Sequence, residues 1–228
     1  MIVIKSERLR SLLRLLIPFA AIPAIAFFGV AIAGEKRHII ISLAVTVLSL
    51  LLFITGFDKR KIGSRRMVIA AIMIALCVVG RFIPFFKPIT AITVITAVYL
   101  GSETGFLVGS LSAFISNFYF GQGPWTPFQM LAWGLIGFIA GCLGRYLKKN
   151  KPLLLIYGVL SGAAYSFIMD IWTVMGYNGE FSTELYLAAL ATALPYTILY
   201  AVSNFIFLFF LEKPFGEKLE RIKLKYGI

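Results

Sequence analysis

The chain has 228 residues, of which 60% are hydrophobic and only 14% are charged, and its formal net charge is +12. A soluble domain carries about 25% charged residues, so this composition excludes a soluble enzyme, and the continuous apolar stretches exclude a disordered chain, a coiled coil and alternating transmembrane strands. The positive charge does not indicate a nucleic-acid partner, because the basic residues gather in short segments between apolar stretches, as the positive-inside rule for membrane proteins requires.

Eight apolar stretches follow one another along the chain, and most are close to the ~20 residues that a helix needs to cross the hydrocarbon core. The sequence therefore predicts an all-α integral membrane protein that crosses the membrane several times. The predicted helices cover residues 12–33, 39–57, 67–86, 89–100, 105–120, 127–146, 152–175 and 186–211. Pro84 interrupts the third stretch and Pro88 precedes the short fourth one, so we expect a broken or re-entrant shape at this point.

The most charged run between predicted helices is residues 58–66. It divides the chain into an N-terminal two-helix transmembrane hairpin at 1–62 and a six-helix membrane domain at 63–228. Nearly all of the unusual polar residues fall in the second part, so substrate binding is expected there.

The basic residues predict the orientation of the chain in the membrane. With eight helices, 18 of the 22 Lys and Arg residues fall on one side. The four on the other side are Lys36, Arg37, Arg81 and Lys87. Since the positive side of a membrane protein is cytoplasmic, we predict that both termini are cytoplasmic.

The sequence contains little catalytic chemistry. His38 is the only histidine and lies in a predicted outer loop, which excludes a histidine-dependent triad and a multi-histidine metal site within the membrane. No nucleotide-binding P-loop pattern is present. We therefore expect no enzymatic activity, no catalytic residue and no metal. A lipid-modifying enzyme that uses Asp170 with Glu180 or Glu184 is the weakest alternative. Such an enzyme needs a pair of acids or a metal motif at helical spacing, and neither appears in the sequence.

Asp170 is the only acidic residue predicted within the membrane, where a charge costs at least ~2.5–3.5 kcal/mol. Two interpretations are equally good: a structural partner of Arg81 or of a hydroxyl group, and a member of a ligand cavity. A proton-coupled secondary carrier of a small amphipathic solute, with Asp170 as the proton site, is a further alternative. Glu103 is expected in a solvated turn on the inner side.

The densest group of polar and aromatic residues is the run 117–130, which occupies a predicted outer loop and the helix ends beside it. Amide side chains can bond the polar rim of a small molecule, while rigid aromatic rings stack on its flat face. Trp133 follows Gln129 by four residues and shares its helix face. The predicted substrate-binding residues are Asn117, Tyr119, Gln122, Trp125, Gln129, Trp133, Asp170, Trp172 and Tyr177.

From about Arg65 to the C-terminus, the chain resembles the substrate-binding S component of an energy-coupling factor (ECF) transporter, a vitamin importer. The resemblance rests on the six-helix count, on Ala71-Ile72-Met73-Ile74-Ala75 in the first core helix, and on the outer run with its Gly-Gln-Gly-Pro-Trp-Thr-Pro core at 121–127. The outer run is the more specific signal and is most similar to the S components of cobalamin uptake.

The resemblance implies a division of labour between chains. The S component binds the vitamin from outside, without a cofactor of its own, and ATP hydrolysis takes place in two cytoplasmic ATPases. A membrane coupling subunit of the EcfT type joins them, and Ala71 and Ala75 match the face that would contact it. The implied transported ligand is cobalamin, with another vitamin as the alternative, and the implied location is the plasma membrane of a prokaryote. The N-terminal hairpin is a departure from the six-helix pattern of the family.

Overall fold

The computed structural model describes residues 6–33, 38–56, 63–178 and 180–226, and every regular element in these ranges is a helix. The N-terminal segment comprises α1 (Glu7–Leu16), the π-helical turn η1 (Ile17–Ala21), α2 (Ile22–Ala33) and α3 (His38–Thr55). The remaining helices are α4 (Gly63–Gly80), α5 (Ile89–Leu100), α6 (Ser102–Phe120), α7 (Thr126–Cys142), α8 (Gly144–Lys149), α9 (Lys151–Asn178) and α10 (Thr183–Tyr226). The prediction of an all-α protein is confirmed for the part of the chain that the structure describes.

Four helical segments are long and apolar enough to cross a membrane by themselves. They are Glu7–Gly29, His38–Thr55, Lys151–Tyr177 and Thr183–Tyr226. The helices α5 and α7 are apolar but shorter. Eleven of the twelve residues of α5 are buried, so its neighbours enclose this short helix, and it does not need to match the thickness of the lipid on its own.

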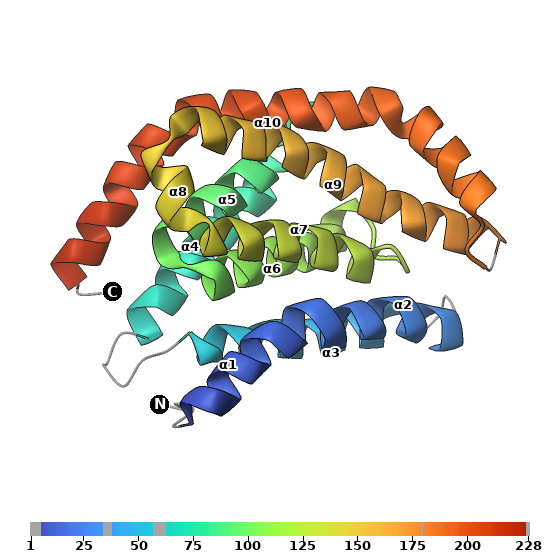
Figure 1. The fold of residues 1–228 in the computed structure, drawn as a ribbon, viewed down its shortest axis with the longest axis horizontal. Coiled ribbons are helices and arrows are strands. Elements are labelled where there is room, and N and C mark those ends of the chain that lie inside the picture. Colours follow the sequence, from blue (N-terminus) through green and yellow to red (C-terminus); the bar gives the residue numbers. More distant parts are fainter. Residues whose placement is uncertain (1–5, 34–37, 57–62, 179, 227–228) are drawn as a thin grey trace.

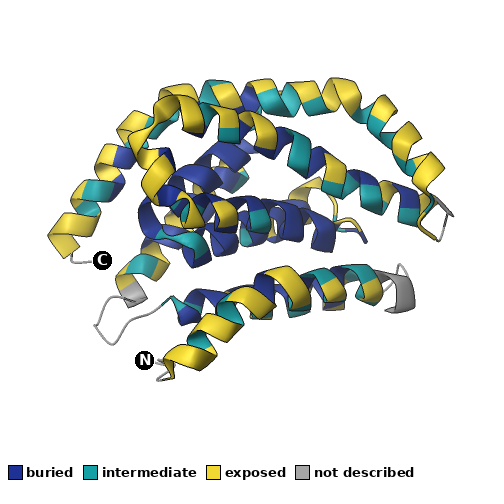
Figure 2. Ribbon diagram, in the orientation of Figure 1, coloured by how far each residue is buried: buried dark blue, intermediate teal, exposed yellow. Residues whose placement is uncertain are grey.

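The helices form a layered bundle with α5, α6 and α7 in its interior (Figure 1). The hairpin of α2 and α3 covers one side, while α9 and α10 cover the other. The long helix α10 arches over the bundle and contains Pro195 and Pro214, which interrupt its hydrogen bonding and permit the bends. Figure 2 shows buried residues concentrated in the interior helices and exposed residues along α10 and the hairpin.

The predicted break near Pro84 and Pro88 lies in the connection between α4 and α5. The helix α4 ends at Gly80, six residues earlier than the sequence predicts, because Pro84 has no amide hydrogen to donate to the Gly80 carbonyl. The ring of Pro88 packs directly against Gly80. Within the connection, Phe85 has a φ of 61°, a conformation that residues other than glycine rarely adopt. This sharp turn places Arg81 and Lys87 at the same end of the bundle as the C-terminal end of α6.

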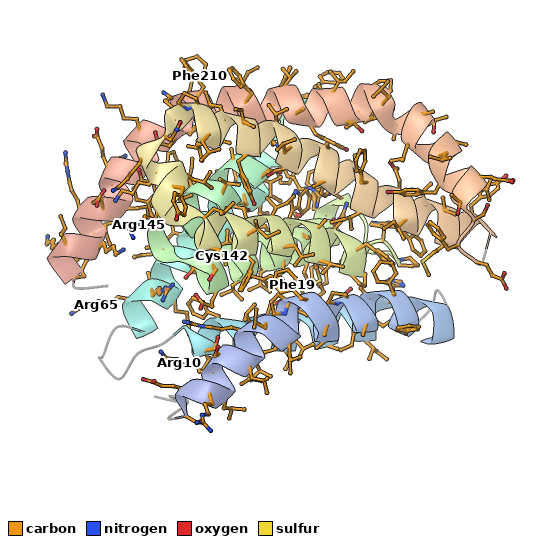
Figure 3. All side chains as sticks on the ribbon, in the orientation of Figure 1. Arg10, Phe19, Arg65, Cys142, Arg145 and Phe210 are labelled. Atoms are coloured by element: carbon orange, nitrogen blue, oxygen red, sulfur yellow. The ribbon has the colours of Figure 1, made fainter. Side chains whose placement is uncertain are left out.

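The start of α1 and the end of α10 lie at the end of the bundle that carries α8 (Figure 1). We call this the inner end, and the opposite end, with the connections 81–88 and 121–125, the outer end. Arg10, Arg65 and Arg145 all lie toward the inner end (Figure 3). The distribution of these arginines agrees with the predicted orientation, while the side of the membrane that each end faces stays a prediction.

Glycine residues allow α6 and α7 to pack backbone against backbone. Gly134, Gly137 and Gly141 lie along α7, and their small-residue spacing predicts close helix packing. The structure confirms this packing: a Cβ atom on Gly105 of α6 would lie 2.6 Å from the carbonyl oxygen of Gly137, and one on Gly109 would meet the carbonyl of Trp133. The close approach fixes Trp133 and its side of α7 relative to α6.

The N-terminal hairpin shares the hydrophobic core of the rest of the chain. Most of its buried hydrophobic residues belong to the same core cluster as those of α4 to α7, while Ile41 packs with Phe128 in a second, smaller cluster. Edge-to-face ring pairs join it to α7, with centroids 5.0 Å apart for Phe27 and Phe128 and 5.6 Å apart for Phe19 and Phe138. The Ser110 hydroxyl donates a hydrogen bond of 3.0 Å to the Ser49 hydroxyl. The boundary at residue 62 itself lies outside the described residues.

An ion pair ties the hairpin to the inner end of α6, and it corrects one expectation. Glu103 is only 5% exposed, and its Oε1 lies 2.5 Å from Nε of Arg14, while Arg66 lies 4.0 Å from its other oxygen. The expected solvated turn is therefore wrong for this residue. Arg14 lies in the N-terminal helix and covers Glu103, a contact between distant parts of the chain that loop counting does not reveal.

Candidate functional site

A pocket opens between five segments near the outer end of the bundle. Its walls come from the 81–88 connection, α5, α7, α9 and α10, and its cavity volume is about 90 Å³. The lining residues are Arg81, Lys87, Ile89, Thr90, Gln129, Trp133, Gly162, Tyr165, Tyr200 and Asn204. This volume is below the about 300–1,000 Å³ of typical small-molecule pockets, but like them the pocket combines aromatic walls with a few polar groups.

Three aromatic rings form the deep wall of the pocket. Trp133 and Tyr165 stack with centroids 4.7 Å apart and planes at 18°, and Tyr200 meets the ring of Tyr165 edge-on at 5.3 Å. The indole nitrogen of Trp133 donates a hydrogen bond of 3.2 Å to the hydroxyl of Thr90. Because these contacts fix the rings, the wall is preorganised for a flat ligand.

A chain of hydrogen bonds runs behind this wall. Arg81 donates from Nη1 to the Oδ1 atom of Asn117 at 2.7 Å and to the hydroxyl of Ser116 at 2.5 Å. The amide nitrogen of Asn117 donates to Oε1 of Gln129 at 2.8 Å, and the amide nitrogen of Gln129 donates to the hydroxyl of Tyr165 at 3.2 Å. The network holds the arginine, the amide and the tyrosine in one arrangement.

The pocket carries two positive charges. The guanidinium of Arg81 lies 5.3 Å from the ring centre of Trp133 and 4.9 Å from that of Phe120, and the Lys87 ammonium lies 5.5 Å from Phe120. Within the described ranges, neither cation forms an ion pair with a carboxylate. Burial lowers the pKa of Lys87, and the charge of Arg81 lowers it further. The pocket therefore favours a ligand with electron-rich or negative groups.

Of the residues predicted from the sequence to bind substrate, Gln129 and Trp133 line the pocket. Asn117 is 1% exposed and supports it from behind through Arg81 and Gln129. Gln122 lies further away. Its amide nitrogen donates a hydrogen bond to the carbonyl of Phe114 at 2.8 Å, and its amide oxygen accepts one from the hydroxyl of Thr126 in α7 at 3.0 Å. These four side chains form one group, as the sequence suggests, but they face the pocket to different degrees.

The other predicted residues lie away from the pocket. Tyr119 and Tyr177 are 72% and 88% exposed. Trp125 covers Gly123 at the start of α7, and Trp172 packs against the ring of Phe128 with centroids 5.7 Å apart. A direct role of these four aromatic residues in substrate binding stays a prediction.

Asp170 is buried in α9, and one of its carboxylate oxygens has no hydrogen-bond partner within the described part of the chain. It forms no ion pair with Arg81, whose hydrogen bonds go to Ser116 and Asn117. The interpretation of Asp170 as a partner of Arg81 is therefore wrong, because α6 supplies the acceptors instead, while a hydrogen bond with the Ser166 hydroxyl agrees with the alternative of a hydroxyl partner.

Sequence reasoning missed most of the residues that complete the pocket. Lys87 was predicted only as a charge on the outer side, and Arg81 only as such a charge and as a partner of Asp170. Tyr165, Tyr200 and Asn204 lie in helices predicted only as membrane spans. Asn204 gave a usable signal, because a buried amide in an apolar helix needs a partner; here it donates to the carbonyl of Gly158 at 3.0 Å.

Comparison with protein families gives one match. The family described as "ECF-type riboflavin transporter, S component" matches residues 61–216, which includes every residue that lines the pocket. The N-terminal hairpin up to residue 60 falls outside the match. Searches among curated proteins and among solved structures gave no significant match.

Proposed function

The chain belongs to the ECF-type riboflavin transporter S component family, and from this premise we propose that it captures riboflavin in the outer pocket for import. Membership makes it a multi-pass membrane protein and the substrate-binding subunit of an ECF vitamin transporter rather than an enzyme. The vitamin, the partners and the residues that act are our proposals.

The aromatic wall carries the proposal for riboflavin. The flat isoalloxazine ring has apolar faces and a polar edge of carbonyl and ring nitrogen atoms. The stacked pair of Trp133 and Tyr165 offers a surface for such a face, and Thr90, Gln129 and Arg81 supply polar groups around it.

Cobalamin is the second candidate, because the run 117–133 is most similar to S components of cobalamin uptake. A corrinoid is much larger than a flavin, and it would need the outer residues Tyr119 and Trp125 as well as a wider pocket than the one described. The family description favours riboflavin, and the small volume of the pocket argues against the larger corrinoid.

We also propose that ATP hydrolysis in separate chains drives uptake. The family works with a membrane coupling subunit and two cytoplasmic ATPases, and Asp170, buried in α9, has no second acid nearby in the sequence to relay a proton. A proton-coupled carrier is therefore the less favoured alternative.

The helix α4 offers a face for the coupling subunit. Ala71 and Ala75 are exposed on it, beside Ile72 at 54% and Val79 at 67% exposure. The opposite face of α4, with Met73 and its buried neighbours, packs into the core. Small residues on an exposed helix face allow another helix to approach closely within a membrane.

Copurification tests this assignment. Replacing Ala75 with tryptophan should reduce the recovery of the coupling subunit and both ATPases with this chain by about tenfold or more, because the bulky ring holds the two helices apart. Ala191→Trp, which places the same ring on an exposed position of α10, is the matched control and should leave recovery unchanged. Full assembly of the Ala75→Trp variant would show that α4 is not the coupling face, and failure of the unaltered chain to recover ATPases would contradict the ECF mechanism.

A further inference from the structure

A groove separate from the outer pocket lies at the inner end of the bundle, between the start of α4 and the end of α10. We call it the inner groove. Its lining residues are Arg65, Val68, Ile69, Ile222 and Tyr226, and its cavity volume is about 390 Å³. It shares no lining residue with the outer pocket. The inner groove combines apolar walls with one charged side chain, Arg65, which lies toward the inner end (Figure 3).

Contacts with α5 hold the wall that α10 contributes. The Tyr99 hydroxyl donates a hydrogen bond of 2.8 Å to Oε1 of Glu212, and the Lys223 ammonium donates one of 3.4 Å to the Tyr99 carbonyl. Ile222 and Tyr226 stand four residues apart in α10 and therefore share one face of the helix. Because α10 is held on α5, this face forms a preformed wall of the inner groove.

Two cations meet at Tyr226. The Arg65 guanidinium donates a hydrogen bond of 3.0 Å to the carbonyl oxygen of Tyr226 and lies 5.2 Å from the centre of its ring. The Lys225 ammonium lies 5.5 Å from the same ring centre. Both side chains are exposed, and the ion pairs found in the described ranges involve neither of them. Since like charges repel, an anion beside Tyr226 would be attracted by both cations.

We propose that the inner groove binds an anionic phospholipid from the leaflet at the inner end of the bundle, with an acyl chain against Val68 and Ile222 and the phosphate at Arg65. The ligand must offer a long apolar part and a negative group, and an anionic phospholipid has both. Basic residues at this level of a membrane protein attract anionic headgroups. A tyrosine ring, apolar with one polar atom, suits the boundary between acyl chains and headgroups.

The competing occupant is the coupling subunit, because the inner groove adjoins the proposed coupling face. Val68 is 60% exposed and precedes Ala71 and Ile72 by three and four residues, so all three lie on one side of α4. Close packing of helices through small residues needs no charge. A phosphate group, in contrast, accepts charge-assisted hydrogen bonds from a guanidinium. The two cations at Tyr226 therefore favour the lipid.

The experiment compares dioleoylphosphatidylglycerol with dioleoylphosphatidylcholine, which has the same acyl chains and no net charge. Binding of each lipid to the purified full chain in detergent is measured by native mass spectrometry. The unaltered chain should prefer phosphatidylglycerol, and Arg65→Gln should lower the ratio of the two affinities about fivefold. Lys149→Gln, which removes an exposed charge from α8 at the same end, is the matched control and should leave the ratio unchanged.

Val68→Trp tests the apolar part of the site. The indole would fill the inner groove from an exposed position, so the affinity for both lipids should fall about tenfold as acyl-chain contacts are lost. Glycerol 3-phosphate, which has the phosphate but no acyl chain, should not displace phosphatidylglycerol at equal concentration.

An unchanged ratio in Arg65→Gln, or an equal fall in Lys149→Gln, would overturn the inference. Lipid binding that survives in Val68→Trp while recovery of the coupling subunit is lost would assign the inner groove to that subunit instead. Displacement by glycerol 3-phosphate would reduce the site to a bare anion site and would also overturn it. Riboflavin takes no part in these measurements, so their outcome is independent of the proposed function.

Discussion

Replacing Trp133 with alanine should lower the affinity of the purified chain for riboflavin by at least about thirtyfold. The indole forms part of the deep wall, stacks on Tyr165 and is only 5% exposed, so its loss removes the largest rigid surface from a dehydrated site. Truncation of such an anchor costs about 2 kcal/mol or more, and 2 kcal/mol corresponds to about thirtyfold in Kd. Equilibrium titration with riboflavin measures the change, and Trp133→Phe should recover most of it.

The other two tryptophans provide matched controls. The sequence predicts Trp125 and Trp172 as substrate contacts too, but in the structure one covers Gly123 and the other packs on Phe128. Each alanine variant should therefore change riboflavin affinity by less than about threefold. A larger loss in Trp125→Ala than in Trp133→Ala would move the site to the outer run and would favour the broader ligand surface that cobalamin needs.

The second large effect concerns stability, and comes from Gly137→Ala. A Cβ atom here would lie 2.5 Å from the carbonyl carbon of Gly105 and 2.8 Å from the side chain of Thr93. Overpacking costs about 1–3 kcal/mol, and we expect the upper end because the obstacle on α6 is backbone, which cannot rotate away. For a chain of this size, about 3 kcal/mol corresponds to a fall of about 6–12 °C in the midpoint of thermal unfolding.

Gly29→Ala is the matched control for this substitution. The added Cβ atom in α2 would lie 3.4 Å from Ile41, an ordinary contact, and alanine favours the helix over glycine by about 0.5–1 kcal/mol. Its midpoint should stay the same or rise. If Gly137→Ala were equally well tolerated, the close packing of α6 on α7 would be wrong, and with it the position of Trp133.

The sequence predicts the parts of the fold that depend on local pattern. Apolar length predicts the helices, Pro84 and Pro88 predict the break after α4, and the glycines of α7 predict its tight packing. Gln129 and Trp133 were found together because they stand four residues apart on one helix face.

The remaining features depend on contacts between distant segments. Tyr200 reaches the pocket only because α10 lies against α9, and no local pattern relates it to Trp133. Glu103 is next to a helix start, and this position suggests a solvated side chain. In the structure, Arg14 covers it from a helix almost ninety residues earlier in the sequence. Arg81 shows the same limit: its charge indicates a side of the membrane, but its place in the pocket comes from hydrogen bonds to α6.

Titration of the purified full chain with riboflavin, followed by quenching of flavin fluorescence, tests the central claim most directly. We predict saturable one-to-one binding with a Kd below ~1 μM, equivalent to about −8 kcal/mol, strong quenching from stacking on the aromatic wall, and no displacement by cobalamin. Absence of saturable riboflavin binding, or binding of cobalamin in its place, would contradict the assignment of this pocket to riboflavin.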